Sequence, residues 1–437
     1  MDYVIAPGGS LQGEVRVPGD KSMSHRSIML GAIAQGTTRV SGFLEGEDAL
    51  ATLAAFRAMG VSIERPGAGE VLIEGVGLHG LQKPDAPLDL GNSGTAMRLM
   101  SGLLAGQAFE STLVGDESLS GRPMNRVIQP LAEMGATIDS SDGGRPPLVI
   151  RGGEPLRGID YVTPMASAQV KSCILLAGLY SSGTTSVTEP GITRDHTERM
   201  LQGFGYAVEC TGSTVSITGG GELQGCDIDV PADISSAAFL LVAASIAPDS
   251  DVTLLHVGIN PTRIGVINIL RLMGADITLS NERDVGGEPV ADIRVRYAPL
   301  KGIEIPEDQV PLAIDEFPVL FVAAACASGR TVLTGAAELR VKESDRIAAM
   351  AEGLVTLGIA AEVLEDGIII DGGTLGGGEI NTFHDHRIAM SFALAGLRAE
   401  REITVRDCGH VATSFPNFSG LVRGLGLNIA EVNGDVA

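Results

Sequence analysis

A charged segment in the second half of the chain has the residue types of an anion-binding site. Lys342, Glu343 and Arg346 stand directly before a helical pattern. Ser344 or Asp345 would cap that helix, which places Arg346 in its first turn. The helix dipole makes a positive charge unfavourable in the first turn unless an anion lies nearby. The segment therefore predicts side chains directed at a ligand, although a solvated, salt-bridged helix start would have the same sequence.

More residues of this kind stand where apolar, buried helices are expected to begin. A buried helix start presents unpaired N–H groups and positive potential, which suit an anion. Ser, Asp and Asn are also ordinary caps, so capping alone would explain many of these positions. Capping does not explain Lys21, Arg26 and Arg387, nor the glycines that would let a ligand approach the backbone. The positions are Lys21, Ser22, Arg26, Gly91, Asn92, Gly94, Ser167, Ala168, Gln169, Asp315, Asp385 and Arg387.

A second set of cations lies in loops before amphipathic helices. If the two sets face one cleft, their charges suit two phosphates and a carboxylate, which arginine forks bind well. Asp315, Glu343 and Asp385 would supply acid–base groups. Arg263 could equally be a surface residue and is left out. The full cation set is Lys21, Arg26, Arg122, Arg194, Lys342, Arg346 and Arg387.

These residues fall on a repeat of about 70 residues that occurs six times along the chain. Each copy has a buried helix, a strand, a loop, an amphipathic helix that ends at a glycine, and further strands. Glycine at that place is the usual left-handed helix stop. The six glycines are Gly60, Gly135, Gly205, Gly274, Gly358 and Gly426. The six buried helices are expected at 27–34, 95–105, 170–179, 236–246, 318–327 and 388–397.

Two proline-bearing joints favour an arrangement of two groups of three copies. Val17-Pro18-Gly19 and Val230-Pro231-Ala232 each precede a buried helix. They divide the chain into a first lobe, 19–231, and a second lobe, 232–437, which residues 1–18 would complete. Two lobes joined by two crossings can open and close as a hinge.

Composition limits the partners. The chain has 437 residues, 44% of them hydrophobic and 4% aromatic, which indicates a large aliphatic core. The net charge of -23 argues against nucleic acid and anionic membranes as partners. The longest apolar runs are too short to span a bilayer. The five scattered cysteines predict reduced thiols in a cytoplasmic protein, and no Cys/His spacing suggests a metal site.

Four motifs together resemble the 5-enolpyruvylshikimate-3-phosphate (EPSP) synthase family, and the resemblance covers the chain in order. They are Pro18-Gly19-Asp20-Lys21-Ser22-Met23-Ser24-His25-Arg26, Leu90-Gly91-Asn92-Ser93-Gly94-Thr95-Ala96-Met97-Arg98, Arg340-Val341-Lys342-Glu343-Ser344-Asp345-Arg346 and Asp385-His386-Arg387. The segments Ala166–Ser172 and Thr193–Thr197 resemble the bacterial type called class II. The family fold this implies is α/β and two-lobed, with six repeated units, three per lobe, as an inside-out α/β barrel.

The resemblance also implies an activity. The enolpyruvyl group of phosphoenolpyruvate would pass to the 5-hydroxyl of shikimate 3-phosphate, with release of phosphate, in aromatic amino acid synthesis. The expected enzyme is a cytoplasmic monomer with no metal, no organic cofactor, no nucleic acid partner and no membrane partner.

The family's functional residues carry over onto matching positions of this chain. Shikimate 3-phosphate would be bound by Lys21, Ser22, Arg26, Ser167, Ala168, Gln169, Arg194, Asp315 and Lys342. Phosphoenolpyruvate would be bound by Lys21, Asn92, Gly94, Arg122, Gln169, Arg346 and Arg387. Lys21, Asp315 and Glu343 would be catalytic: Asp315 would orient and deprotonate the hydroxyl, Glu343 would serve C3 of phosphoenolpyruvate, and Lys21 would neutralise or protonate the leaving phosphate.

Some positions depart from the family pattern, and two other functions compete. Thr413 stands where many relatives have Lys, and Glu338 where many have Asn. Gly94 predicts sensitivity to glyphosate, whereas Leu99, where others carry Pro, weakens that inference. One alternative is the sister transferase that acts on UDP-N-acetylglucosamine, but that enzyme generally has Lys-Asn where this chain has Lys21-Ser22. The other is a non-catalytic phosphometabolite-binding protein, which would not need Asp315 and Glu343.

Overall fold

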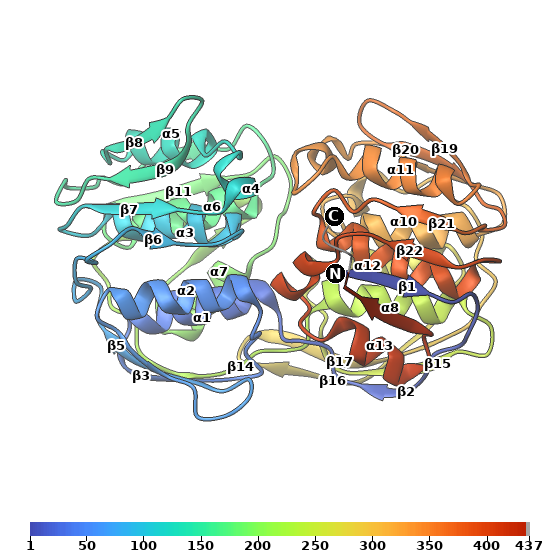
Figure 1. Cartoon of the computed structure of the whole chain (residues 1–437). Coiled ribbons are helices and arrows are strands. Elements are labelled where there is room, and N and C mark those ends of the chain that lie inside the picture. The colour runs from blue at the N-terminus through green and yellow to red at the C-terminus, as the bar shows by residue number, and fades with distance from the viewer. Residues whose placement is uncertain (434–437) are drawn as a thin grey trace. The chain divides into compact units, whose positions relative to one another are not determined.

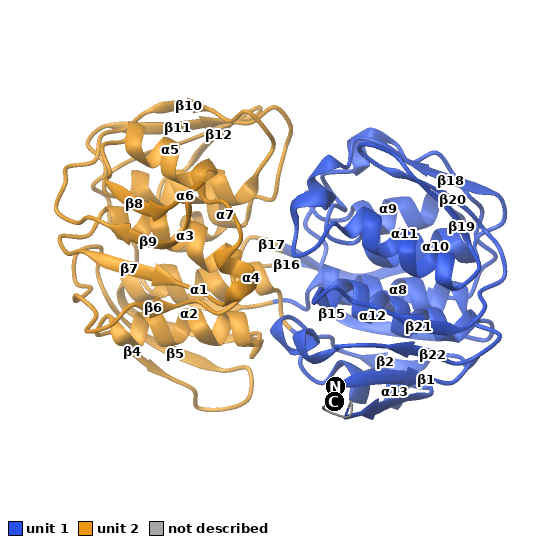
Figure 2. Cartoon of the chain, turned by 45° about the horizontal axis from the view of Figure 1, so that its top comes forward, with its two compact units in different colours: residues 1–18, 231–284, 289–437 blue, residues 19–230, 285–288 orange. Residues whose placement is uncertain are grey.

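The computed structural model describes residues 1–433 of the chain, which forms two compact units, shown separately in Figure 2. Unit 2 consists of Gly19–Val230 together with the short segment Val285–Glu288. Unit 1 consists of Met1–Pro18, Pro231–Asp284 and the chain from Pro289 onward. The main chain therefore enters unit 2 after Pro18 and leaves it after Val230. The sequence-based boundaries kept 285–288 within the second lobe, whereas this turn belongs with unit 2.

Unit 2 contains three copies of one arrangement. In each copy a buried helix leads to a strand, a second helix follows, and two antiparallel strands complete a sheet. A further strand then pairs in parallel with the next copy: β6 with β7, β10 with β11, and β14 back onto β3. The helices are α1 Lys21–Ile33, α2 Glu47–Ala58, α3 Gly94–Ala105, α4 Glu117–Ser120, α5 Asn125–Glu133, α6 Ala168–Gly178 and α7 His196–Gly203. The strands are β3 Gln35–Ser41, β4 Ser62–Glu64, β5 Val71–Val76, β6 Leu88–Asp89, β7 Ser111–Val114, β8 Ile138–Ser141, β9 Arg145–Ile150, β10 Asp160–Val162, β11 Thr184–Thr188, β12 Glu209–Thr211, β13 Thr214–Thr218 and β14 Asp227–Asp229.

Unit 1 repeats the arrangement, but its last copy is completed by the N-terminus. β1 lies between β22 and β23, antiparallel to both, and β2 pairs in parallel with β15. The helices are α8 Ile234–Ile246, α9 Gly265–Leu272, η1 Glu307–Gln309, α10 Phe317–Cys326, η2 Ala337–Val341, α11 Arg346–Thr356, α12 His386–Ala395, η3 Gly396–Arg398, η4 Gly409–Thr413 and α13 Phe418–Leu425. The strands are β1 Asp2–Ile5, β2 Gln12–Val15, β15 Asp251–Gly258, β16 Asp276–Val285, β17 Glu288–Arg296, β18 Arg330–Leu333, β19 Ala360–Val363, β20 Ile368–Asp371, β21 Gly378–Ile380, β22 Ile403–Val405 and β23 Ile429–Val432.

The six expected helix stops are confirmed. All six glycines follow the ends of the amphipathic helices and have positive φ, between 80° at Gly205 and 124° at Gly426. A residue with a Cβ is strained in that conformation, so glycine fixes where each helix ends and where the next strand can begin.

The buried helices form the centre of each unit, with the sheets around them (Figure 1). In unit 1, α8, α10 and α12 contact one another, and all thirteen residues of α8 are buried. In unit 2, α3 contacts both α1 and α6. A Cβ on Gly102 of α3 would lie 2.1 Å from the carbonyl oxygen of Cys173 in α6, so the close approach of these two helices requires glycine. Small residues thus set the spacing that brings the helix starts of each unit together.

The described strands form three separate sheets in each unit and no closed barrel. Of the expected inside-out α/β barrel, the inner helices and outer sheets are present. All five cysteines are free thiols, as predicted. Among the described residues, no helix is both long enough and apolar enough to cross a membrane.

Candidate active site

In unit 2, helix α1 begins with the first group of predicted site residues. The side chain of Asp20 caps the helix by accepting from the Met23 amide at 2.8 Å. Lys21 is the first helical residue, and its Nζ lies 2.5 Å from a carboxylate oxygen of Asp48. The cap therefore places the Lys21 ammonium and the Ser22 side chain at the end of the helix where N–H groups are unpaired.

Arg26 lies one turn further along α1 and is held by three elements. Its Nε donates to Thr197 Oγ1 of α7 at 2.7 Å, and its Nη2 donates to Ser172 Oγ of α6 at 2.8 Å. Nη1 donates to the Ser22 carbonyl at 3.0 Å. Arg26 is only 4% exposed. Because hydroxyl and carbonyl oxygens fix the plane of this guanidinium, the group is preorganised for an anion.

His25 stands behind this group and is fully buried. Its Nδ1 is 2.8 Å from Thr52 Oγ1. Burial, together with the positive charges of Lys21 and Arg26, lowers the pKa of His25 well below its ordinary value. His25 is therefore neutral at physiological pH and adds no positive charge to those of Lys21 and Arg26.

Helix α3 begins with the second group. Ser93 caps the helix by accepting from the Ala96 amide at 3.1 Å. Asn92 accepts from Arg122 Nη2 at 2.7 Å and donates to Asp116 at 2.8 Å. A Cβ on Gly94 would lie 3.0 Å from Arg98 Nη1 and 3.4 Å from Arg122 Nη1. Glycine at this helix start keeps the space in front of both guanidinium groups open.

Helix α6 begins with the third group, Ser167, Ala168 and Gln169. Ser167 caps the helix through a long contact, 3.5 Å, from the Val170 amide. Gln169 accepts from Arg98 Nη1 at 2.5 Å and donates to Thr95 Oγ1 at 2.9 Å, both on α3. The contacts therefore join the starts of α3 and α6, while Arg26 joins α1 to α6.

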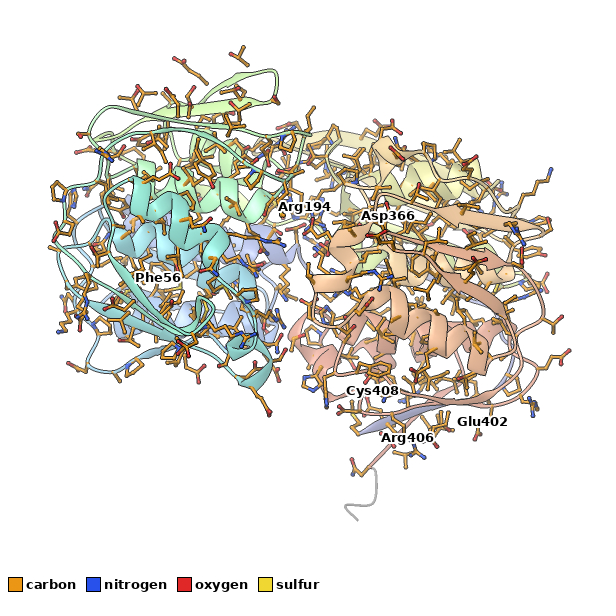
Figure 3. All side chains as sticks on the ribbon, turned by 90° about the horizontal axis from the view of Figure 1, so that it is seen from above. Phe56, Arg194, Asp366, Glu402, Arg406 and Cys408 are labelled. Atoms are coloured by element: carbon orange, nitrogen blue, oxygen red, sulfur yellow. The ribbon has the colours of Figure 1, made fainter. Side chains whose placement is uncertain are left out.

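Arg194 lies in the loop before α7 (Figure 3), and a buried ion cluster holds this loop. Lys171 of α6 is 2% exposed, and its Nζ lies 2.8 Å from Glu189 and 2.7 Å from Glu198. Burial alone would lower the pKa of Lys171, but Glu198 and Glu189 raise it above its ordinary value. The Thr193 hydroxyl donates to the Glu189 carboxylate at 2.7 Å. Because Arg194 follows Thr193 directly, this cluster positions it.

In unit 1, helix α11 begins as the sequence predicted. Asp345 caps it by accepting from the Ala348 amide at 3.0 Å, and Arg346 is its first residue. The Arg346 side chain is 1% exposed and contacts three carboxylates. Its Nε donates to Asp385 at 2.8 Å and its Nη2 to Glu343 at 2.6 Å, while Nη1 lies 3.4 Å from Asp315. A positive charge at the N-terminus of a helix is unfavourable, and here three carboxylates of the protein itself offset it.

The two predicted proton-transfer carboxylates therefore share one guanidinium. Lys342 adds a second cation, since its Nζ lies 3.3 Å from Asp315 and 3.0 Å from Glu338. Glu338, the departure from the family pattern, thus pairs with Lys342. Burial would lower the pKa of Arg346, but Asp385, Glu343 and Asp315 raise it above its ordinary value. Burial would raise the pKa of Asp385, but Arg346 holds it below its ordinary value.

Arg387 lies at the start of α12, where Asp385 is the cap. Its Nη1 donates to the Asp315 carbonyl at 2.9 Å and lies 3.9 Å from the buried carboxylate of Glu316. Glu316 also accepts from Ser235 at the start of α8. The starts of α8, α10 and α12 are therefore joined by polar contacts, as are the helix starts of unit 2.

The structure excludes the alternative in which Arg263 is a surface residue. It is 3% exposed, and its Nη2 donates to Asp233, the cap of α8, at 3.0 Å and to Ser235 Oγ at 2.6 Å. Thr413, the other departure from the family pattern, is 6% exposed and donates to the His410 carbonyl at 2.7 Å. The Thr413 hydroxyl thus stabilises the η4 turn in which Thr413 lies.

Comparison with known proteins identifies the family. The family model described as EPSP synthase (3-phosphoshikimate 1-carboxyvinyltransferase) matches residues 5–421. The chain belongs to the EPSP synthase family. Relatives named 3-phosphoshikimate 1-carboxyvinyltransferase from Alkalilimnicola ehrlichii and Methylococcus capsulatus are each 66% identical, covering 100% and 98% of this chain and 97% and 98% of their own. The chain is accordingly an enzyme of that type, a transferase of the shikimate pathway and aromatic amino acid biosynthesis.

Solved structures agree on the fold. The EPSP synthase of Acinetobacter baumannii is 60% identical, with a TM-score of 0.89 over 98% of this chain and 99% of that one. The enolpyruvyl transferase NikO of Streptomyces tendae is 18% identical with a TM-score of 0.81, covering 99% and 98% of the two chains. That second likeness concerns the fold alone. The chain has the two-lobed enolpyruvyl transferase fold that its sequence predicted.

Proposed function

We propose that the chain transfers the enolpyruvyl group of phosphoenolpyruvate to the 5-hydroxyl of shikimate 3-phosphate, through the residues that the sequence predicted. The shikimate 3-phosphate residues are Lys21, Ser22, Arg26, Ser167, Ala168, Gln169, Arg194, Asp315 and Lys342. The phosphoenolpyruvate residues are Lys21, Asn92, Gly94, Arg122, Gln169, Arg346 and Arg387. Lys21, Asp315 and Glu343 carry the chemistry.

The contacts in unit 2 support the binding roles. Phosphate recognition needs fixed donors, and Arg26 is fixed by the Thr197 and Ser172 hydroxyls. Asn92 holds Arg122 in the same way, next to the open space at Gly94. Lys21, at a helix start, would neutralise negative charge on either substrate and on the departing phosphate.

The carboxylates of unit 1 support the proton-transfer roles. The reaction adds the hydroxyl to C2 of phosphoenolpyruvate while C3 gains a proton. Phosphate then leaves as C3 loses a proton. Asp315 would accept the hydroxyl proton in the first step. Glu343 would give the C3 proton in the first step and take one back in the second, so one carboxyl group serves both steps.

The observation that carries this assignment is that Asp315 and Glu343 contact the same guanidinium, that of Arg346. A substrate anion that binds Arg346 would compete with Glu343 for its charge. That competition favours the protonated form of Glu343, which is the form that can protonate C3. Binding of phosphoenolpyruvate at Arg346 would thereby favour the protonated Glu343 that the first step needs.

The test is release of inorganic phosphate from phosphoenolpyruvate by the purified protein with EDTA present. One reaction contains shikimate 3-phosphate, and a matched reaction contains UDP-N-acetylglucosamine. We expect release only with shikimate 3-phosphate. Release only with the nucleotide sugar would overturn the acceptor, and release with neither would overturn the activity.

Gly94 supports the expectation that glyphosate inhibits the enzyme in competition with phosphoenolpyruvate. A methyl group at this position would lie 3.0 Å from Arg98 Nη1 and 3.4 Å from Arg122 Nη1, so Gly94→Ala should narrow the space there. We expect the wild type to be inhibited at glyphosate concentrations near those of phosphoenolpyruvate and Gly94→Ala to be about 10-fold or more less sensitive, a steric cost of about 1.4 kcal/mol. Wild-type activity that persists far above the phosphoenolpyruvate concentration would contradict this.

We also propose that the enzyme works in the cytoplasm as a monomer. The cysteine thiols support a reducing compartment, because all five are free. Light scattering on the purified chain would measure the mass of the assembly. A stable dimer would contradict the proposal that the enzyme is a monomer.

A further inference from the structure

Two loops of unit 1 bring three metal-ligating side chains together. His384 lies in the loop between β21 and α12, one residue before Asp385. Asp407 and His410 lie after β22, with His410 inside η4. One ligand atom from each of the three residues lies within 4.8 Å of the other two.

The separations between His410 and the other two ligand atoms are close to those around a tetrahedral metal ion. His384 Nδ1 is 3.3 Å from His410 Nε2, and His410 Nε2 is 3.9 Å from Asp407 Oδ2. His384 Nδ1 also contacts Asp407 Oδ2 directly. Ligand atoms at about 2.0–2.1 Å from a tetrahedral zinc ion lie roughly 3.3 Å apart. Small side-chain rotations would therefore complete the three-ligand set.

The hydrogen bond between His384 and Asp407 accounts for that pair but not for the place of His410. If His384 Nδ1 carries a proton, that single proton faces both Asp407 and His410 and cannot bond well to each. At 3.9 Å, His410 is too far from Asp407 for a direct hydrogen bond. A cation at the common point would satisfy all three atoms at once.

The backbone of both loops is fixed in an unusual conformation. Phe383, His384 and Asp407 have positive φ, between 52° and 59°, which is uncommon for residues with a side chain. The Thr382 hydroxyl donates to the Asp407 carbonyl at 3.1 Å and ties the two loops together. The Asp407 amide donates to Asp2 at 2.9 Å.

The neighbours of Asp407 are engaged elsewhere. The Arg406 guanidinium pairs with Asp2 and Glu379, both at 2.6 Å, and the Cys408 thiol donates to the Val405 carbonyl at 3.3 Å. Arg406 and Cys408 are labelled in Figure 3 and flank Asp407 in the chain. The Asp407 carboxylate thus faces the two imidazoles, and within residues 1–433 its ion-pair partners are these two histidines.

We propose that His384, Asp407 and His410 bind one divalent transition-metal ion of the zinc class. Two imidazoles and a carboxylate are ligands that zinc, nickel and copper accept, whereas calcium and magnesium prefer oxygen alone. The side chain of His384 is 73% exposed, and those of Asp407 and His410 are 44% and 38% exposed, so water fills the remaining positions.

The bound ion joins the loop before Asp385 to the η4 turn, which Thr413 closes. It therefore stabilises the start of α12, on which Arg387 lies, and takes no part in the transfer reaction. The sequence did not reveal this site because His384 and His410 lie too far apart for any recognised ligand spacing. No metal was expected from the sequence.

Titration of the EDTA-treated, desalted full chain with Zn²⁺ tests the proposal. Calorimetry should give one site per chain, and His384→Ala and His410→Ala should each weaken it about 10- to 100-fold. His79→Ala is the matched control, because His79 is an exposed histidine of unit 2 whose ring meets Tyr180 edge-on, and this variant should bind zinc as the wild type does. Co²⁺ should give the strong visible absorption of a tetrahedral site in the wild type.

Binding should also raise the midpoint of thermal unfolding in the wild type and leave it unchanged in the double variant His384→Ala/His410→Ala. Equal midpoints of the two proteins in EDTA would establish that the double variant is folded. No saturable Zn²⁺ binding by the wild type, or equally tight binding by the double variant, would overturn the proposal. Phosphate release measured with EDTA is unaffected by either result, so the proposed function is tested separately.

Discussion

Arg26 and Arg122 of unit 2 have different contacts from Arg346 of unit 1. In unit 2, Arg26 and Arg122 donate to hydroxyl, carbonyl and amide oxygens. In unit 1, Arg346 contacts three carboxylates, those of Asp385, Glu343 and Asp315. Hydroxyl, carbonyl and amide oxygens fix the direction of a guanidinium, whereas carboxylates also offset its charge. The difference suggests that unit 2 mainly holds the substrate anions, while unit 1 mainly moves protons.

The largest effect is expected from Glu343→Gln. The amide retains the shape of the side chain but cannot exchange a proton with C3, so kcat should fall about 10²- to 10⁴-fold with little change in KM. Glu338→Gln is the control, because Glu338 also contacts a cation of this site, and its kcat should stay within about 3-fold of the wild type, under 1 kcal/mol. Equal losses in kcat and substrate affinity for Glu343→Gln would make Glu343 a structural residue.

The next largest effect is expected from Lys171→Met in unit 2. The change leaves Glu189 and Glu198 buried without their cation, which should lower the free energy of unfolding by about 3–5 kcal/mol. Lys83→Met, an exposed lysine of the same unit, should change it by less than about 0.5 kcal/mol. Denaturant unfolding measures both. If the shikimate 3-phosphate affinity of the folded Lys171→Met protein equals that of the wild type, the cluster does not position Arg194.

A smaller loss is expected from Arg26→Lys. The lysine retains the charge but loses the planar fork that Thr197 and Ser172 orient, so shikimate 3-phosphate affinity should fall about 10- to 100-fold. The control is Arg39→Lys, an exposed arginine on β3. Calorimetric titration gives both affinities. An unchanged affinity for Arg26→Lys would remove Arg26 from the binding set.

The smallest effect is a pH dependence of stability caused by His25. Its pKa is lowered in the folded protein, so below the ordinary value of 6.5 the unfolded chain binds a proton that the folded chain does not. Stability should fall as pH decreases from about 6.5 toward the folded pKa, by up to about 1.4 kcal/mol for each pH unit. His25→Asn should flatten the dependence between pH 7 and 5. Parallel curves for the two proteins would contradict this assignment.

The sequence predicted the repeat well because its signals are local. The glycine after each amphipathic helix is required by a positive φ, and the capping role of Asp345 follows from its place before α11. Buried polar partners were missed for the opposite reason. Lys171 meets Glu189 and Glu198 only after α6, β11 and α7 have packed, so no local pattern marks the cluster.

The same limit applies to Arg263 and to the carboxylates around Arg346. Arg263 is a lone arginine in a loop, and its burial against Asp233 and Ser235 depends on the packing of α8. The charged segment at Lys342 was interpreted as directed at a ligand, whereas the anions that contact Arg346 in the structure are carboxylates of the protein. The segment did not reveal that Asp385, 39 residues away in the chain, would be the closest carboxylate to the Arg346 Nε. Pairings between distant repeats therefore had to come from the structure.

The most direct test of the division between the units is equilibrium binding of shikimate 3-phosphate to Glu343→Gln and to Arg26→Lys, measured beside their turnover. The account predicts that Glu343→Gln binds within about 3-fold of the wild type, a difference under 1 kcal/mol, although its turnover is lost. It predicts that Arg26→Lys binds weakly. If Glu343→Gln loses affinity as strongly as Arg26→Lys does, the two units do not divide binding and proton transfer between them.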